Sequence, residues 1–420
     1  MLGEDQITLF LVIIAVFLVS MYALGAYVTR SAIYGLSYKF GLTLVFEISA
    51  VIAFLHVYDL PFQVSFTSMI VISLLYVIYF GLLLAGYLLQ HDSKRTSAAV
   101  SENLNFSYSR PVVEPFAWGL IGLATILILF ISQLVDAPPF SRMFYERTRV
   151  GFGHLYYPAV LFTNLAVVLG LFAVHGKLQK PILVLSGIVL SAAFGSKWVL
   201  ALQSVVVVYY AYAVLGYRID TRKVVPVTLG IGASLIFAFW LFSPFARSNL
   251  LDFSIQYSEY TRNLMLVVET WNEYKYGQLT LENNLFPLLP RALYPEKPLV
   301  FGSLRLSEHY YPESVELSQG LPSFGPFGAV WADFGPLAFL IVGVVGFAQG
   351  FLIRKIEIRL YKRNHIGLFI AYITLVGLPL INPGVISTTV IAINIAIGIM
   401  LHWVCLFRLR PGGNYAYSRR

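Results

Sequence analysis

Long apolar runs alternate with short polar connections along most of the chain. A helix needs about 20 residues to cross roughly 30 Å of hydrocarbon, and eleven runs approach or exceed that length. They cover residues 7–28, 37–56, 66–89, 116–135, 152–175, 181–195, 197–216, 225–245, 326–352, 366–381 and 385–407. The pattern predicts an all-α polytopic membrane protein with about 11 transmembrane helices.

The charges in the connections predict an orientation. Most of the 29 Lys and Arg residues fall in alternate connections, and the basic side of a membrane protein faces the cytoplasm. We therefore expect the N-terminus outside and the C-terminus in the cytoplasm. The predicted parts are helices 1–8 over residues 1–245, a large external loop over 246–325, and helices 9–11 with a basic tail over 326–420.

The loop over residues 246–325 contains three different patterns. Apolar residues recur every three or four positions from Ile255 to Tyr276, which predicts an amphipathic helix that could lie on the membrane face and end at Gly277. Prolines between residues 287 and 298 then favour an extended strap. Residues 303–310 predict two short helical turns.

Composition excludes several classes of function. Hydrophobic residues make up 58% and charged residues 12% of the chain, with a mean hydropathy of +0.74, so a water-soluble fold is excluded. The net charge of +8 is not gathered into a basic run interleaved with aromatics, so we expect no nucleic acid partner. Cys405 is the single cysteine, and no nucleotide, metal or flavin motif is present, so we expect no cofactor and no metal.

Lys and Arg residues of membrane proteins usually gather on the cytoplasmic side. Those on the predicted outer side therefore indicate an anionic partner. Arg offers a planar fork that matches phosphate oxygens, and Lys offers a compact charge. Converging cations would therefore hold a diphosphate, although each side chain alone could simply reach for lipid phosphates. The candidate diphosphate-binding residues are Lys197, Arg247, Arg291, Lys297 and Arg305.

Carboxylates and a histidine near these cations are candidates for acid–base chemistry. His309 and Glu308 lie in the predicted helical turns of the loop, and Asp333 lies near the start of the ninth helix. Each is a candidate catalytic base. Glu47 lies midway along the second helix, where an ionised group is costly, and serves either a structural or a proton-relay role.

Three stretches from residue 194 onward form recognisable motifs. They are the corner Phe194-Gly195-Ser196-Lys197, the strap Pro290-Arg291-Ala292-Leu293-Tyr294-Pro295-Glu296-Lys297-Pro298, and Asp333-Phe334-Gly335. Together they resemble motifs of the oligosaccharide repeat-unit polymerases of the Wzy type, the O-antigen and exopolysaccharide polymerase family. Lys197 replaces the arginine that is commoner in the corner motif. The first half of the chain shares only the many-helix layout.

The resemblance implies a metal-independent glycosyltransferase that uses a polyprenyl-diphosphate sugar. It would transfer a glycan linked to undecaprenyl diphosphate onto the next lipid-linked repeat unit, on the outer face of the bacterial inner (cytoplasmic) membrane. The implied partners are the lipid-linked oligosaccharide, membrane lipids and a chain-length-regulating co-polymerase. The alternatives are a transporter or flippase for lipid-linked oligosaccharides, which the absence of an evident inverted repeat disfavours, and an O-antigen ligase.

Overall fold

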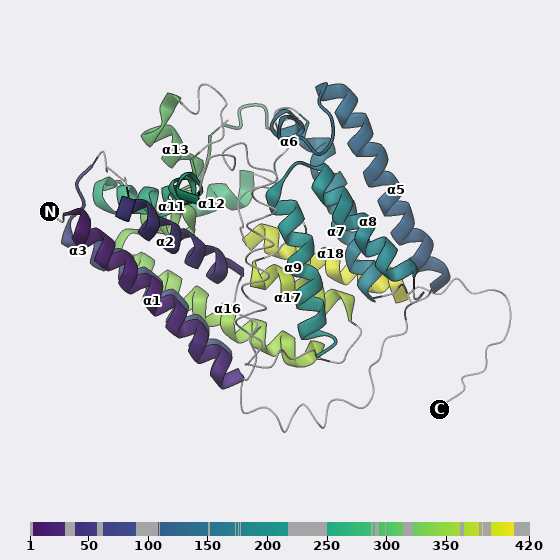
Figure 1. The fold of residues 1–420 in the computed structure, drawn as a ribbon, viewed down its shortest axis with the longest axis horizontal. Coiled ribbons are helices and arrows are strands. Elements are labelled where there is room, and N and C mark those ends of the chain that lie inside the picture. Colours follow the sequence, from purple (N-terminus) through teal and green to yellow (C-terminus); the bar gives the residue numbers. More distant parts are fainter. Residues whose placement is uncertain are drawn as a thin grey trace. The chain divides into compact units, whose positions relative to one another are not determined.

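In the computed structural model, all regular secondary structure among the described residues is helical (Figure 1). These are residues 3–29, 38–56, 62–89, 108, 110–149, 152–172, 174, 176, 178–216, 250–286, 289, 294–298, 300–313, 322–361, 365–377, 380 and 388–406. The α-helices used below are α1 (Glu4–Thr29), α2 (Tyr38–His56), α3 (Phe66–Leu89), α5 (Arg110–Val135), α6 (Arg142–Arg149), α7 (Gly153–Phe172), α8 (Gln179–Ala193), α9 (Lys197–Ala213), α11 (Leu250–Thr270), α12 (Gln278–Leu285), α13 (Leu304–Tyr310), α15 (Gly325–Phe334), α16 (Ala338–Leu360), α17 (Ile366–Val376) and α18 (Thr388–Leu406).

The predicted apolar runs correspond closely to these helices. The third run matches α3 from end to end, and every other run except the eighth overlaps a described helix. The eighth run, residues 225–245, lies outside the described residues. The short helix α6 follows the fourth run and was not predicted.

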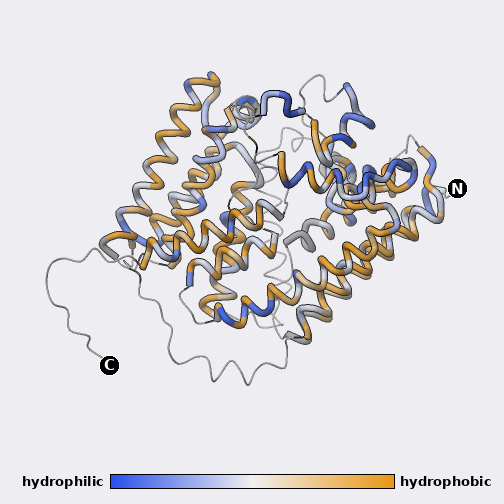
Figure 2. The backbone as a smooth tube through the Cα atoms, turned by 180° about the vertical axis from the view of Figure 1, so that it is seen from behind, coloured by the Kyte–Doolittle hydropathy of each residue, from blue (hydrophilic) through white to orange (hydrophobic). Residues whose placement is uncertain are grey.

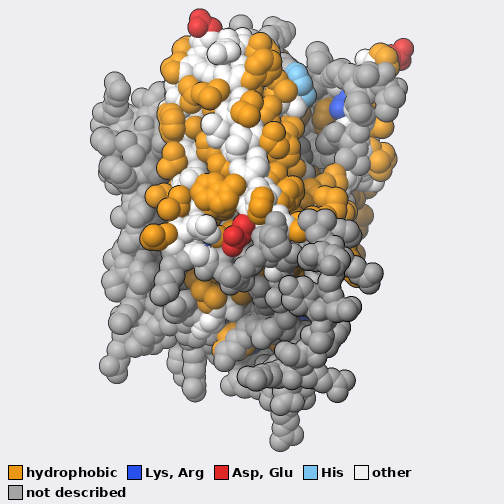
Figure 3. Space-filling model, turned by 90° about the vertical axis from the view of Figure 1, so that its right-hand side faces the viewer, with side chains coloured by type: hydrophobic (Ala, Val, Ile, Leu, Met, Phe, Trp, Pro, Cys, Tyr) orange, Lys and Arg blue, Asp and Glu red, His pale blue; other side chains and the backbone are white. Residues whose placement is uncertain are grey.

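Six helical stretches among the described residues are long and apolar enough to cross a membrane. They are Glu4–Leu24, Phe66–Leu89, Val112–Val135, Gly153–Phe172, Gly325–Leu360 and Thr389–Leu406. Hydrophobic residues follow the tube along these helices (Figure 2), and among the described residues on the face that Figure 3 shows, most of the coloured side chains are hydrophobic. A polytopic membrane protein is supported, while the number of eleven spans and their orientation stay predictions.

The ninth run lies within the apolar stretch Gly325–Leu360, and a break near its start, which was not predicted, divides it into α15 and α16. Between α15 and α16, Gly335 adopts a φ of +54° and opens a short 3-10 turn that contains Pro336. A Cβ atom at Gly335 would lie 2.8 Å from the ring of Tyr274. Glycine suits both the left-handed conformation and the close ring, so the helix breaks here. Asp333 therefore lies at the end of α15 and not inside a continuous span.

The chain divides into two compact units. The first comprises residues 1–100, 216–359 and 372–393, and the second comprises residues 101–215, 360–371 and 394–420. The long loop over 246–325 thus belongs to the first unit, and the corner at Lys197 belongs to the second.

Within the first unit, α3 and α16 run parallel and in close contact. A Cβ atom at Gly346 would lie 2.5 Å from the carbonyl oxygen of Tyr79, and one at Gly350 would lie 1.9 Å from that of Leu83. Glycines four residues apart share a helix face and allow two helix backbones to approach. The parallel course is also the relation that the predicted orientation requires between the third and ninth runs.

Helix α11 packs onto α2 through aromatic rings. Phe46 stacks on Tyr260 with ring centroids 4.2 Å apart and on Tyr257 with centroids 6.1 Å apart. Leu264 and Val267 of the same predicted stripe are buried. The stripe therefore has protein as its partner, and a position on the membrane face stays a prediction.

Helix α11 also ends earlier than predicted, at Thr270 and not at Gly277. Trp271 donates its indole N–H to the carbonyl oxygen of Ala332 at 3.0 Å, which fixes the chain against α15 just after α11. Glu269 accepts hydrogen bonds from the amide and hydroxyl of Ser65, each at 2.9 Å, at the start of α3. The end of α11 is thus held by two tertiary contacts that local sequence does not encode.

Candidate functional site

The described part of the long loop is organised around the short helix α12. Its first turn is capped by the buried carboxylate of Asp333, which accepts hydrogen bonds from the amides of Gly277 at 2.9 Å, Leu279 at 3.1 Å and Thr280 at 2.8 Å. The Thr280 hydroxyl donates a further bond at 2.6 Å. A carboxylate at a helix N-terminus satisfies free amides and interacts favourably with the helix dipole. These contacts give Asp333 a structural role, and its role as a base stays a prediction.

Glu282, in the middle of α12, holds the start of α13. Its carboxylate accepts bonds from the Arg305 guanidinium at 2.9 and 2.7 Å and from the Gly302 amide at 2.7 Å. Gly302 adopts a φ of +58°, and a Cβ atom there would lie 2.0 Å from the Asn283 side chain. Arg305 is thus fixed by a bidentate ion pair, yet 40% of its side chain remains exposed.

We expect Glu282→Gln to destabilise the loop by about 1 to 2 kcal/mol, because a charge-assisted pair becomes a neutral one. Burial opposes ionisation of Glu282, but bonds from the Gly302 amide, Gln278 and Arg305 outweigh it, so its pKa lies below the ordinary 4.5. The charged form is favoured by folding, so this stabilisation is present above pH 4.5 and is lost as the pH falls through the lower folded pKa.

Hydrogen exchange of amides 302–306 between pH 3 and pH 7 measures this effect. Protection in the native chain should fall at the acid end, whereas Glu282→Gln should show a flat, lower protection throughout. Glu273→Gln is the matched control, since Glu273 is an exposed acid of the same loop that pairs with Lys275. Equal pH profiles for the native chain and Glu282→Gln would contradict the assignment.

Lys297 binds the other end of α12. Its ammonium donates hydrogen bonds to the carbonyl oxygens of Phe286 and, at 3.1 Å, of Leu289, and it lies 5.2 Å from the centre of the Phe301 ring. Free carbonyls at a helix C-terminus attract a cation in this way. Lys297 therefore joins the end of the predicted strap to the end of α12.

The same end of α12 is anchored to α18. Thr389 donates its hydroxyl to the carbonyl oxygen of Asn284 at 2.9 Å and its amide to the Asn284 side chain at 3.2 Å. Helix α12 is thus tied to α15 at its start and to α18 at its end. Arg305 and Lys297 contact it at positions four residues apart, about 6 Å along the helix. The sequence had placed both cations in one site, and the structure brings both onto α12.

His309 and Glu308 are exposed at the end of α13, the helix that corresponds to the helical turns predicted over residues 303–310. The His309 ring meets the ring of Trp271 edge to face at 5.1 Å and that of Tyr310 at 4.7 Å. Tyr310 shares a 2.8 Å hydrogen bond with the hydroxyl of Thr270. The imidazole is therefore held by packing on one side and open on the other.

Sequence reasoning missed a polar group that joins α11 to the end of the loop. Arg262 donates to the Tyr311 hydroxyl at 3.2 Å, and that hydroxyl donates to Asn263 at 2.7 Å. Asn263 in turn donates to the Ser323 carbonyl oxygen at 3.0 Å. Glu282 was missed as well. The only available signal for either was a polar residue interrupting an apolar helical pattern, and that signal names no partner.

The predicted tight corner between α8 and α9 is confirmed in the second unit. Gly195 has a φ of +64°, and a Cβ atom there would lie 2.3 Å from the carbonyl oxygen of Ser141. Phe194 packs edge to face on Tyr156 at 5.3 Å. Glycine therefore lets the corner approach the segment before α6 closely. Lys197 begins α9, but its side chain is not among the described parts, nor are Arg247 and Arg291. A meeting of Lys197 with the loop cations stays a prediction.

Glu47 is completely buried on α2. One carboxylate oxygen accepts bonds from the hydroxyls of Tyr76 at 2.6 Å and Thr261 at 3.1 Å. The second oxygen has no hydrogen-bond partner among the residues that the structure describes. Glu47 thus joins α2 to α3 and α11, which favours the structural role among those considered.

Comparison with curated proteins finds two relatives with the same description. The chain is 28% identical over 262 residues to the O-antigen polymerases of Salmonella typhimurium (strain LT2) and Salmonella typhi, over 60% of this chain and 63% of each relative. The chain is thus similar in sequence to these two O-antigen polymerases. The resemblance to the Wzy type is thereby confirmed.

The match to O-antigen polymerases covers less than two thirds of the relatives' own length. No family model matches the chain, and no solved structure matches it. The likeness to O-antigen polymerases therefore rests on these two relatives, together with the helical, apolar architecture.

Proposed function

We propose that the chain polymerises oligosaccharide repeat units linked to undecaprenyl diphosphate, on the outer face of the bacterial inner membrane. The observation that carries this proposal is the 28% identity over 262 residues to O-antigen polymerases. The organisation of the long loop around α12, with Arg305 and Lys297 one turn apart, is the local chemistry that agrees with it. A chain-length-regulating co-polymerase is a partner that belongs to this proposal.

The reaction would form one glycosidic bond and break one. The acceptor hydroxyl of one repeat unit attacks the anomeric carbon of another glycan, whose bond to the diphosphate oxygen breaks. The hydroxyl proton goes to a base, and undecaprenyl diphosphate leaves with increased negative charge. Cations placed at that charge stabilise the transition state. In this proposal the positive charge comes from five cations, and no metal is needed. They are Lys197, Arg247, Arg291, Lys297 and Arg305.

His309 and Glu308 are the candidate bases for the acceptor proton, because both are exposed on α13 beside the Arg305 pair. We expect replacement of the true base by alanine to lower the polymerisation rate about 100-fold. His309→Ala and Glu308→Ala are matched, since they are neighbours on the same short helix. An initial rate measured from pH 5 to pH 9 identifies the base, because its loss removes one limb of the profile. If neither variant changes the rate, the base lies elsewhere.

The function itself is tested with purified protein and one lipid-linked repeat unit. A ladder of longer lipid-linked chains is the expected product. Transfer of glycan only when a lipid A core acceptor is added would identify a ligase. Movement of the intact lipid across vesicles without any longer product would identify a flippase. Either of these outcomes would overturn the proposal.

A further inference from the structure

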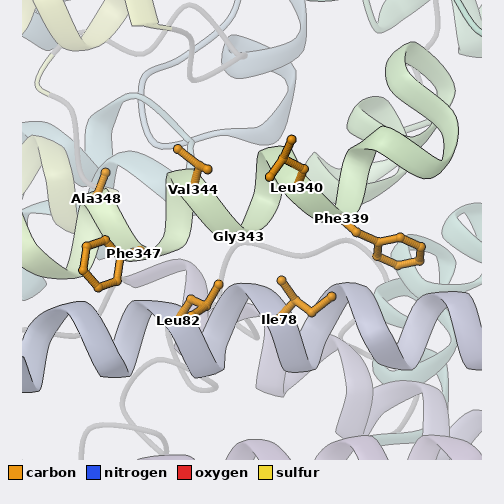
Figure 4. Close-up of a pocket in the computed structure, with 8 residues that line it drawn as sticks. All are labelled: Ile78, Leu82, Phe339, Leu340, Gly343, Val344, Phe347 and Ala348. Carbon is orange, nitrogen blue, oxygen red and sulfur yellow. The ribbon is translucent and has the colours of Figure 1, made fainter.

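A shallow apolar groove lies along the seam between α3 and α16, and its occupant has not been assigned. Its volume is about 410 Å³, within the usual range of roughly 300–1,000 Å³ for ligand sites. Ile78 and Leu82 of α3 form one wall, and Phe339, Val344 and Phe347 of α16 lie along the other (Figure 4). Every lining side chain is apolar, and Gly343 has no side chain, so the groove suits a hydrocarbon chain.

We propose that this groove holds the isoprenoid tail of the lipid-linked substrate. This inference rests on the proposed function and adds to it a place for the part of the substrate that enters the membrane. Three features carry it: the shape of the groove, its opening to lipid, and the ring contacts that join it to the residues just before α12.

The shape depends on glycine. A Cβ atom at Gly343 would lie 3.0 Å from a methyl group of Leu82 and 3.2 Å from one of Ile78, so any side chain there would enter the space between the helices. Further along, Gly346 and Gly350 bring α16 against the backbone of α3 and limit the depth of the seam. The groove runs over residues 339–348 of α16, about 13 Å of helix.

The groove opens toward the surrounding lipid. Val344 and Leu340, on its rim, are 61% and 67% exposed. In a helix of a membrane protein such a surface contacts hydrocarbon, so a lipid tail can enter from the side without crossing the protein. An isoprenoid chain and a phospholipid acyl chain share this chemistry, and position decides between them.

Aromatic ring contacts join the groove to the residues just before α12. The ring of Phe339, which lines the groove, lies 5.9 Å from that of Trp331, and Trp331 lies 6.2 Å from Tyr274 just before α12. Trp331 is 6% exposed, and its indole N–H has no hydrogen-bond partner among the described residues. A buried, unused donor beside the entrance suits an oxygen-rich head group.

The position favours a tail whose head group is bound by the loop. Once the diphosphate is held, the tail meets the groove at a high effective concentration, and a phospholipid has no such anchor. The break at Gly335 and Pro336 separates Asp333, at the end of α15, from the start of α16. The residue that caps α12 and the residues that line the groove therefore follow each other along one chain segment.

Val344 and Val345 provide a matched pair for the test. Both are exposed valines on α16, at 61% and 52%, but only Val344 lines the groove. A photoreactive amino acid at residue 344 should crosslink to undecaprenyl diphosphate in vesicles of phosphatidylethanolamine and phosphatidylglycerol, whereas one at residue 345 should crosslink to phospholipid. Crosslinking at residue 344 to phospholipid alone would overturn the proposal.

Kinetics give the second measurement. Val344→Trp should raise the KM about tenfold for a repeat unit on the full undecaprenyl tail, because the larger ring occupies part of the groove and the tail loses its apolar contacts there. It should leave the KM for a two-isoprene analogue unchanged. Val345→Trp should change neither. Equal effects on both substrates, or no effect on either, would contradict the groove assignment.

The two proposals fail separately. Crosslinking of undecaprenyl diphosphate at residue 344 without any ladder would leave the groove standing and remove the polymerase function. If the protein makes the ladder but Val344→Trp leaves the KM unchanged, the polymerase function stands and the groove assignment fails.

Discussion

Arg291→Ala is expected to lower the rate of chain extension by roughly 100- to 1,000-fold, the usual cost of removing one donor from a developing negative charge. Residue 291 lies in the sequence between Leu289 and Lys297, and the Lys297 ammonium donates to the carbonyl oxygens of Phe286 and Leu289. The corresponding Pro-Arg strap is also one of the stretches that resemble the Wzy type. The product is measured as the length distribution of lipid-linked chains.

The control for Arg291→Ala is Lys275→Ala, which removes a cation of the same loop that pairs with the exposed Glu273. Lys297→Met then distinguishes binding of the diphosphate from the contact that Lys297 makes with the end of α12. It keeps the apolar stem but loses the ammonium, so we expect a raised KM with a smaller change in kcat than Arg291→Ala causes. Normal polymer length from Arg291→Ala, with protein still in the membrane, would refute the role of Arg291.

Asp333→Ala is expected to abolish detectable polymer by releasing the start of α12. Three backbone amides and one hydroxyl would lose their acceptor, at a cost of roughly 3 kcal/mol or more. Hydrogen exchange of amides 277–282 should then rise together with the loss of activity. The effect should spread to Arg305, since Glu282 holds it from the same helix.

Asp333→Asn distinguishes a helix cap from a catalytic base. Asparagine remains a good N-cap, with one oxygen that can still accept from the α12 amides. We therefore expect it to keep partial exchange protection and a measurable fraction of the activity. If Asp333 is instead the base, Asp333→Asn will lose activity while amides 277–282 keep their native protection. That result would overturn the structural role argued above.

Helix positions were largely predictable because local hydropathy sets them. The run over residues 66–89 matched α3 fully, and the predicted turns over 303–310 became α13. Boundaries fixed by tertiary contacts were not predictable. Helix α11 ends early where Trp271 binds the Ala332 carbonyl oxygen, and the ninth run breaks where Gly335 meets the Tyr274 ring. The Trp271 contact has no signal in the local pattern, whereas the Gly335-Pro336 pair is a helix-breaking signal that the hydropathy pattern alone does not register.

The candidate site was predicted by residue type and not by pairing. Charge on the predicted outer side pointed to Arg305 and Lys297, and both contact α12. Their immediate partners are Glu282 and free helix carbonyls, which lie eight or more residues away in the sequence. Asp333, selected as an acid beside the loop, proved to cap α12.

The sequence by itself determined that lipid is the solvent of this chain, where its apolar helices run, and that one long polar loop carries the unusual cations. Those features follow from composition and periodicity, which act over a few neighbouring residues. Only the tertiary structure decided that α12 is the centre of that loop, with Asp333 at its start, Glu282 holding Arg305, and Lys297 at its end. Burial and hydrogen bonding bring together residues that are distant in the sequence, and a one-dimensional pattern does not record which donor will find which acceptor.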